Sequence, residues 1–328
     1  MIVVIGEALI DLVGEADGRY RPVPGGSPAN VAVGLARLGA PTELLARLGT
    51  GVFGAIVREH LIRNDVGLSH AVEATEPATL AVVTLDDTGL PGYDFYVSGT
   101  ADWGWRPGEL PDELPDSASA LCTGSLAIAL APGAAEIADL VRRECDRGQV
   151  TIVVDPNTRP ALLGDRTEAC RRLRGFIEAA DIVKVSDEDL AWLEPDAPVE
   201  QVAADWLGQG PALVVVTRGS QGAFAATQRG VTVNVPARPV RVADTVGAGD
   251  AFTSGLVDAL RRRDLLGGTV GRDRLAELDS TTLTQVVGDA GLVAAITCGR
   301  RGADPPTAGE VAAYRDPRLP AGGIESDT

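Results

Sequence analysis

A carboxylate stands directly beside a turn of small residues late in the chain. Residues 244–252 read DTVGAGDAF and lead into an apolar-periodic stretch typical of a helix. At such a helix N-terminus the backbone N–H groups of Gly247, Ala248 and Gly249 are expected to point outward and to bind an anion. A carboxylate at Asp250 would be repelled by an anion bound there, so its position needs a functional reason. Phosphoryl transfer supplies one, because the carboxylate takes the proton of an attacking hydroxyl while the amides hold the charge on the γ-phosphoryl group.

Composition argues against several other reaction classes. The only histidines, His60 and His70, lie neither in an H-E-x-x-H motif nor beside a cysteine, so a zinc site is not expected. The sequence contains no G-x-S-x-G, which disfavours a Ser-His-Asp hydrolase. A P-loop kinase needs Gly-Lys, whereas the single lysine, Lys184, follows Val183. Taken alone, however, Asp250 could also be an ordinary acidic residue in the first turn of a helix.

A dinucleotide-dependent oxidoreductase is an alternative of another class. Residues 49–54 form a literal G-x-G-x-x-G between a strand-like run and a helical pattern. The motif follows the second predicted strand rather than the first, and the acidic residue expected about 20 positions later would be only Glu73 or Glu76. Asp250 would then have no function, so this interpretation is the weaker one.

Charge and cysteine usage limit the partners and the compartment. The chain of 328 residues has a formal net charge of −17 and a pI of about 4.5, which disfavours nucleic acid and anionic membranes as partners. The four cysteines are widely spaced without a Cys-x-x-Cys pair, as in proteins of a reducing compartment. The first residues lack a basic n-region, and no stretch approaches about 18 uninterrupted apolar residues. We expect a cytoplasmic protein.

Short apolar runs alternate with helical patterns along most of the chain. Such alternation predicts an α/β fold with a mostly parallel sheet that is covered by helices on both faces. The predicted strands are 2–5, 42–48, 120–124, 151–156, 181–186 and 212–217, and the clearest helical patterns are 28–38, 54–64 and 134–145.

Two segments, 12–23 and 78–99, break this alternation. The second contains two strand-like runs joined by a turn-rich stretch, so both segments are interpreted as a small inserted β-flap. Active sites of open α/β sheets lie at the carboxyl ends of the strands, where a flap could act as a lid. The alternative is a pair of surface hairpins without ligand contact. Residues 316–328 are polar and glycine-rich and predict a flexible tail.

Two long motifs resemble the signatures of the ribokinase-like (phosphofructokinase-B-type) carbohydrate kinases. The C-terminal signature is similar to DTVGAGDAF at every position, and the N-terminal signature is similar to GGSPANVAVGLARLG at 25–39. The resemblance covers about residues 1–315 as one kinase domain. It implies a three-layer α/β/α fold with a mostly parallel sheet and a small β-sheet lid, and a kinase that uses ATP and Mg²⁺.

The resemblance implies a role for each residue that matches the family motifs. Asp250 is implied as the catalytic base, and Asp11, Gly25, Gly26 and Asn30 as sugar-binding residues, with Asp11 placed at the end of the first strand. The chemistry agrees, since a carboxylate accepts from two hydroxyls, glycines permit close approach, and an amide both donates and accepts. Taken singly, the two glycines would indicate a turn and Asn30 a helix cap.

Five further positions are implied to contact phosphate or nucleotide. Arg159 resembles the arginine that fructokinase-type members place near the transferred phosphate. Lys184, the only lysine beside 28 arginines, lies at an apolar strand end where those members also have a lysine. A functional role is favoured, and a chance occurrence is the alternative. Thr217, Gly219 and Gly222 match the nucleotide loop of the family.

The resemblance also implies two cation sites. Ser186 and Asp189 fall where the family has an Asn-x-x-Glu motif that organises Mg²⁺ through water, and the aspartate has a shorter reach than the usual glutamate. The family often binds a monovalent cation such as K⁺ beside the anion site. The corresponding groups here are Asp244, the carbonyl of Val246 and the loop 297–306.

Substrate choice within the family depends on three features. The segment YDFYVSGTADW (93–103), the DPNTR motif (155–159) and Lys184 look most like fructokinases, whose aromatic and Thr-Ala-Asp positions face the sugar. This predicts conversion of fructose to fructose 6-phosphate, with 2-keto-3-deoxygluconate kinase and ribokinase as alternatives. A sugar-binding protein without catalysis is an alternative of another class. A homodimer formed through the lid is a further expectation.

Overall fold

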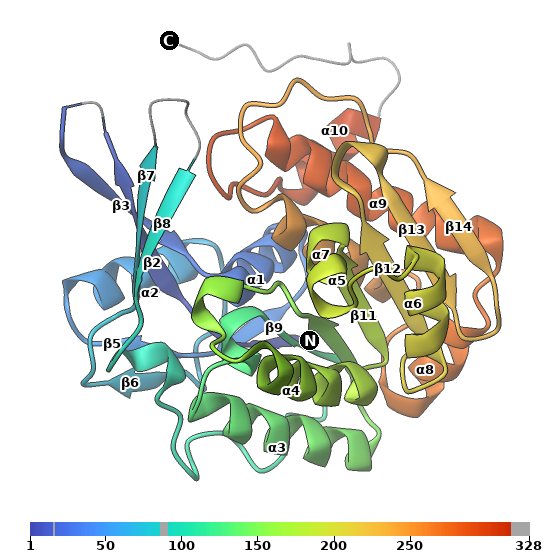
Figure 1. Ribbon diagram of the computed structural model, residues 1–328, viewed down its shortest axis with the longest axis horizontal. Coiled ribbons are helices and arrows are strands. Elements are labelled where there is room, and N and C mark those ends of the chain that lie inside the picture. Colours follow the sequence, from blue (N-terminus) through green and yellow to red (C-terminus); the bar gives the residue numbers. More distant parts are fainter. Residues whose placement is uncertain (16, 86–90, 316–328) are drawn as a thin grey trace.

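The computed structural model describes residues 1–15, 17–85 and 91–315 and is built around an eight-stranded sheet (Figure 1). From one edge to the other its strands are β14 (Thr232–Val235), β13 (Ala223–Thr227), β12 (Leu213–Thr217), β11 (Ile182–Ser186), β10 (Thr151–Asp155), β9 (Ala120–Gly124), β1 (Ile2–Ile5) and β4 (Thr42–Leu45). The strands from β4 to β12 pair in parallel, and only β13 and β14 are antiparallel. The predicted α/β class is confirmed.

Successive residues of the parallel strands face opposite sides of the sheet. In β1, Ile2 and Val4 belong to one core cluster, whereas Val3 and Ile5 belong to the other. All four side chains are at most 1% exposed, so the strand is buried on both faces. Burial on both faces requires a continuous apolar run instead of an alternating pattern, which is why the sequence reveals these strands clearly.

Helices cover both faces of the large sheet and complete the three predicted layers (Figure 1). The apolar side chains of each helix join the core cluster of the face that it covers. One face carries α3 (Gly133–Arg147), α4 (Arg166–Ala179), α5 (Asp187–Leu193) and α6 (Val199–Leu207). The other carries α1 (Ser27–Arg37), α2 (Val52–Arg63), α7 (Ala248–Arg261), α8 (Gly268–Ala276) and α9 (Ser280–Cys298), with α10 (Ala308–Arg315) packed on α9.

Helix α9 is long and apolar enough, by length and composition alone, to cross a membrane. Its side chains Leu283, Val286, Val287 and Ala290 are nevertheless buried in the core cluster, and the helix packs against α7, β13 and β14. Its apolar character is therefore explained by its position in the core.

A separate four-stranded sheet stands beside the large one, at the left of Figure 1. Its order is β3 (Tyr20–Gly25), β2 (Leu9–Gly14), β7 (Leu80–Leu85) and β8 (Pro91–Tyr96), so the two segments that break the alternation do form one sheet. Strands β2 and β3 extend beyond the predicted limits 12–23. As a correction, Asp11 lies on β2 of this small sheet and not at the end of the first strand. The turn-rich stretch was predicted at 86–92, but Pro91 and Gly92 already belong to β8. Its residues 86–90 and the tail 316–328 lie outside the described residues.

The predicted strand 42–48 is two strands in different sheets. Residues 42–45 form β4, whereas β5 (Arg47–Gly49) pairs only with β6 (Val72–Ala74) in a two-stranded sheet. The G-x-G-x-x-G motif therefore follows a strand outside the large sheet. A Cβ on Gly54 would lie 1.7 Å from the carbonyl oxygen of Gly49, so this glycine serves close packing. The position rules out the dinucleotide interpretation, which requires the motif at a central parallel strand.

Candidate active site

Helix α7 starts in a turn that requires glycine. Gly247 has a φ of +74°, and a Cβ there would lie 2.5 Å from the Cβ of Ala303. The amide of Ala248 donates to the carbonyl of Thr245 at 3.2 Å, so one member of the predicted anion site is already paired. Within the described residues the amide of Gly249 has no such acceptor. A free amide together with the helix dipole gives this end of α7 the properties of an anion site.

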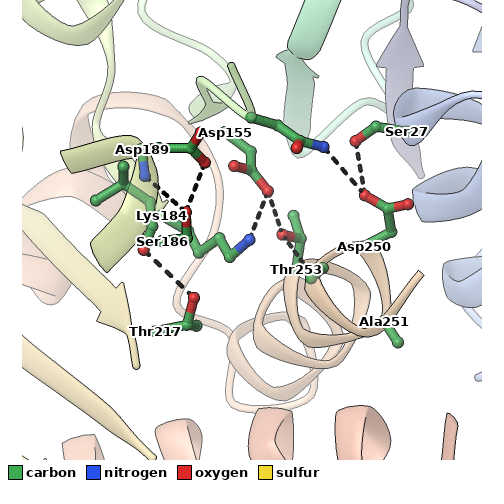
Figure 2. A network of polar contacts seen from close by, with 12 residues as sticks. Ser27, Asp155, Lys184, Ser186, Asp189, Thr217, Asp250, Ala251 and Thr253 are labelled. Atoms are coloured by element: carbon green, nitrogen blue, oxygen red, sulfur yellow. Dashed lines mark hydrogen bonds and ion pairs between the residues drawn. The ribbon is translucent and has the colours of Figure 1, made fainter. Parts of the chain in front are cut away.

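Asp250 is buried in the first turn of α7 and is held by the N-terminus of α1. Its Oδ1 accepts from the hydroxyl of Ser27 at 2.7 Å (Figure 2), and its Oδ2 accepts from Nδ2 of Asn30 at 2.8 Å. The Nδ2 of Asn157, in the loop after β10, lies 3.5 Å from Oδ1. Asn30, expected to bind sugar, therefore also orients this carboxylate.

The close approach of α1 and α7 explains how these side chains meet. A Cβ on Gly34 of α1 would lie only 2.3 Å from Oγ of Ser254 on α7. The same Ser254 hydroxyl donates to the backbone carbonyl of Asp250 at 2.7 Å. Because Gly34 has no side chain, the two helices pack closely enough for Ser27 to reach the carboxylate.

The surroundings of Asp250 shift its acidity in opposing directions. Burial raises the pKa of Asp250, the bonds from Ser27 and Asn30 lower it, the nearby Asp155 raises it, and Lys184 lowers it. The net direction is upward, so the carboxylate is a stronger base than an exposed aspartate. A general base works best when its pKa lies nearer to the working pH.

Asp11 approaches the two glycines that begin the second predicted sugar-binding cluster. A Cβ on Gly25 would lie 2.3 Å from Oδ2 of Asp11, and Gly26 has a φ of +100° with its Cβ position 2.7 Å from the carbonyl oxygen of Glu7. Backbone conformation and close approach therefore require glycine at 26, whereas a side chain at 25 would displace the carboxylate of Asp11. The structure thus brings the predicted sugar-binding residues Asp11, Gly25 and Gly26 together.

Asp11 also shares an electrostatic environment with the base. Burial raises the pKa of Asp11 to about 6, the charge of Arg159 opposes this rise, and the charge of Asp250 adds to it. Arg159 donates to Oδ1 of Asn157 at 2.6 Å and to the carbonyl of Thr158 at 2.8 Å. The predicted phosphate-binding arginine therefore lies on the loop that also approaches Asp250.

Lys184 lies in the middle of β11, and its side chain reaches the N-terminus of α7. It is 3% exposed, and its Nζ lies 2.8 Å from Oδ2 of Asp155 (Figure 2). The same Nζ is 3.2 Å from the position that a Cβ on Gly249 would occupy. The only lysine in the chain thus faces the anion site and forms an ion pair with Asp155.

Asp189, the predicted magnesium ligand, is bonded within the chain through both oxygens. Its amide donates to Oγ of Ser186 at 3.0 Å, and the Ser186 hydroxyl donates to Oδ2 at 2.7 Å, an arrangement that caps α5. Thr158 donates to Oδ1 through its amide at 2.9 Å and its hydroxyl at 2.5 Å. Among the described residues no cluster of three or more His, Cys, Asp or Glu could hold a metal ion. Mg²⁺ needs no such cluster when phosphates and water supply most of its ligands.

A cavity of about 600 Å³ adjoins the N-terminus of α7. The predicted nucleotide residues Thr217, Gly219, Gly222 and Gly249 line it, but Lys184 does not. The sequence did not reveal its apolar walls, because they come from the end of β14, from the loop after it and from α9. Their members include Val235, Pro236, Pro239, Val240, Val242, Val287, Ala294 and Cys298.

The predicted monovalent-cation residues also come together. Oδ1 of Asp244 accepts from the amide of Val246 at 3.1 Å, and Oδ2 accepts from the amide of Gly302 at 2.8 Å. Since Ala303 of the same loop contacts Gly247, this group lies directly beside the start of α7.

Two of the Thr-Ala-Asp positions are bonded at the base of the small sheet. Asp102 is 2% exposed, and its carboxylate accepts from the amides of Ala8 at 2.9 Å and Thr79 at 3.3 Å. These amides precede β2 and β7, and Thr79 also donates its hydroxyl to Thr100 at 2.6 Å. Thr100 and Asp102 therefore fix the base of the small sheet, and the expectation that the Thr-Ala-Asp positions face the sugar stays a prediction.

A buried carboxylate beside a helix N-terminus, on a parallel α/β sheet with a small second sheet, is an arrangement suited to phosphoryl transfer. The model of the pfkB family carbohydrate kinases matches residues 1–308, and the chain belongs to this family. It is a carbohydrate kinase of the class that transfers phosphoryl groups from ATP.

Relatives agree with this assignment over most of their length. A fructokinase of Rhizobium leguminosarum bv. trifolii is 35% identical over 287 residues, which cover 86% of this chain and 85% of the relative. The crystal structure of fructokinase with bound ATP from Xylella fastidiosa has a TM-score of 0.87 at 27% identity and covers 95% of this chain and 97% of that one. A fructokinase double mutant from Vibrio cholerae O395, with fructose, ADP and potassium bound, has a TM-score of 0.80 at 27% identity and covers 96% and 98%.

Proposed function

We propose that this carbohydrate kinase is a fructokinase, which converts fructose and ATP to fructose 6-phosphate and ADP. The observation that carries the proposal is the buried carboxylate of Asp250 at the start of α7, held by Ser27 and Asn30. Fructokinases among the relatives and the solved structures support the choice of sugar.

The sugar hydroxyl reacts while Asp250 accepts its proton. The hydroxyl oxygen forms a bond to the γ-phosphorus, the bond from that phosphorus to the bridging oxygen of ATP breaks, and ADP leaves with the electron pair. Asp11, Gly25, Gly26 and Asn30 are proposed to bind the remaining sugar hydroxyls. The charge of Asp250 adds to the raised pKa of Asp11, which supports the proposal that both carboxylates face the same sugar.

Positive groups around the start of α7 are proposed to stabilise the charge on the transferred group. The amide of Gly249 and the ammonium of Lys184 approach from the helix and from β11, and Arg159 approaches from the loop after β10. ATP is proposed to occupy the 600 Å³ cavity beside this site, in contact with Thr217 and Gly222. The volume lies within the range of about 300–1,000 Å³ that is usual for small-molecule sites.

Two cations are proposed to assist. Asp189 would hold Mg²⁺ through water, and a bound Mg²⁺ supplies charge neutralisation between the β- and γ-phosphates. Asp244 and the carbonyl of Val246 would hold a monovalent cation such as K⁺, and the potassium-bound relative supports this choice. The carboxylate and carbonyl oxygens of these residues are the donor types that both cations prefer.

The small sheet, including 12–23 and 78–99, is proposed to act as a lid that closes on the sugar and excludes water. Hydrogen exchange in β2, β3, β7 and β8 is then expected to slow with fructose but not with ATP alone, and no change with any sugar would contradict the lid.

We also propose a cytoplasmic homodimer formed through this small sheet. Tyr20 and Tyr96 are 50% and 60% exposed on the same face of it, and a monomer in sedimentation velocity would contradict the dimer.

The experiment that tests the substrate is ADP release with fructose, ribose, 2-keto-3-deoxygluconate, glucose and adenosine. We expect the highest kcat/KM with fructose. A tenfold preference for ribose or 2-keto-3-deoxygluconate would keep the family and replace the substrate. Sugar binding without ADP release from any sugar would instead support the binding protein that lacks catalysis.

A further inference from the structure

A second buried carboxylate lies behind the anion site, and the proposed reaction does not use it. Asp155 ends β10 and is 5% exposed. Its Oδ2 accepts from Nζ of Lys184 at 2.8 Å and from the hydroxyl of Thr253 at 3.0 Å (Figure 2). The bonds join three separate elements, β10, β11 and α7, at one oxygen atom.

Thr253 connects this oxygen to the first turn of α7. Its hydroxyl also lies 3.1 Å from the carbonyl of Gly249, one helical turn earlier. Lys184 therefore has a fixed position relative to the helix N-terminus, with Nζ 3.2 Å from the Cβ position of Gly249. An ammonium has three donors, and the bond to Asp155 uses one of them. The remaining donors are available to an anion at the start of α7.

Asp155 is the counter-charge of the buried lysine. Burying a charge is costly unless the charge is paired and hydrogen-bonded. Removing one partner of a buried ion pair leaves the other charge uncompensated. A neutral group in place of Asp155 would thus leave Lys184 without its counter-charge and weaken the bond that orients it.

The other oxygen of Asp155 is left without a bond in the described part of the chain. Its Oδ1 is buried and has no hydrogen-bond partner among the described residues. A cavity of about 10 Å³ is lined by Asp155, Ser27, Thr123 and Thr253. This is about the size that one water molecule requires, and Ser27 in turn donates to Asp250. Asp155 is therefore adjacent to both halves of the proposed machinery, the lysine and the base.

We propose that Asp155 is a positioning residue for phosphoryl transfer, which pairs with Lys184 and directs its ammonium group at the start of α7 without contacting either substrate. The inference rests on the proposed roles of Lys184 and Asp250. Its effect passes through Lys184, so the two residues must be coupled in the kinetics.

A double-mutant cycle tests this coupling in the full-length protein. Asp155→Asn is expected to lower kcat by about 10²-fold, as for the loss of one stabilising group, while the KM for fructose changes less than threefold. In the background of Lys184→Met the same substitution is expected to change kcat less than threefold. Thr253→Val, which keeps both charges, is expected to lower kcat by about threefold to tenfold and provides a second variant if Asp155→Asn fails to fold.

Asp181→Asn is the matched control. Asp181 is also a poorly exposed strand-end carboxylate, bonded to the amide of Ile152 at 2.8 Å and to Arg272 at 2.9 Å, but it lies outside the site. This variant is expected to lower Tm and to leave kcat within twofold. The inference is wrong if the losses of kcat in the two single variants multiply in the double mutant. It is also wrong if Asp155→Asn has the wild-type kcat while Lys184→Met is impaired. Both results leave the proposed role of Lys184 intact. Wild-type kinetics in Lys184→Met would overturn the proposed role of the lysine as well.

Discussion

The hydroxyl of Ser27 donates to Oδ1 of Asp250 across 2.7 Å, although 223 positions separate the two residues in the chain. This bond joins the N-terminal motif of α1 to the C-terminal motif of α7. It depends on the contact of Gly34 with Ser254, which lets the helices approach closely. Helix α1 thus orients the proposed base and lowers its pKa, and it starts directly after the proposed sugar-binding residues Gly25 and Gly26.

Ser27→Ala is expected to change the pH profile of the enzyme. The bond from Ser27 stabilises the ionised form of Asp250 and lowers its pKa, so its loss raises that pKa further. The acidic limb of kcat should move to higher pH, and kcat at pH 6 should fall by about threefold to tenfold. Steady-state ADP release between pH 5 and 9 measures both. An acidic limb at the wild-type position would show that Ser27 does not act on the base.

Sugar affinity is expected to depend on the ionisation of Asp11. Burial raises the pKa of Asp11 to about 6, and the ionised form is the one that accepts bonds from sugar hydroxyls. The KM for fructose should therefore fall as pH rises from 5 to 7, whereas the KM for ATP should not follow. Asp11→Asn should weaken fructose binding by about tenfold or more and abolish this dependence. Equal losses of fructose and ATP affinity in calorimetry would indicate misfolding instead.

The free energy of unfolding is expected to depend on pH through Glu7, which precedes the small sheet. Glu7 is 1% exposed, and burial raises its pKa from 4.5 to about 7. Between these values the folded state binds more protons than the unfolded state, so the stabilising contribution is complete below 4.5 and is lost as pH rises to about 7. The shift corresponds to about 3 kcal/mol.

Glu7→Gln removes the titrating group and keeps most of its hydrogen-bonding capacity. Urea unfolding at pH 5 and pH 8 should show the variant gaining stability relative to the wild type at the higher pH. A difference between variant and wild type that stays constant across this range would contradict a raised pKa of Glu7.

The sequence predicted those features whose cause is local. Strands buried on both faces appear as continuous apolar runs, and β1 and β12 were therefore predicted within one residue. The turn at Gly247 and the carboxylate of Asp250 were identified because small residues and a helical pattern adjoin in the chain. Helix α7 starts where that pattern predicts.

The remaining features depend on contacts between distant segments. A bend at Gly6, with a φ of +154°, separates β1 from β2, so Asp11 belongs to another sheet than the apolar run before it. Ser27 and Asp155 received no role, because their partners Asp250 and Lys184 are set by helix and strand packing. The burial of Asp102 follows equally from three chain segments that meet at the base of the small sheet.

The most direct test of the account is turnover by Asp250→Asn with fructose and ATP, measured beside fructose binding by calorimetry. The asparagine keeps the size of the side chain and the approach of Ser27 but cannot accept the proton of the sugar hydroxyl. We predict fructose affinity within about threefold of the wild type and a loss of kcat of at least about 10²–10⁴-fold. A kcat within tenfold of the wild type would show that Asp250 is not the catalytic base and would contradict the proposed mechanism.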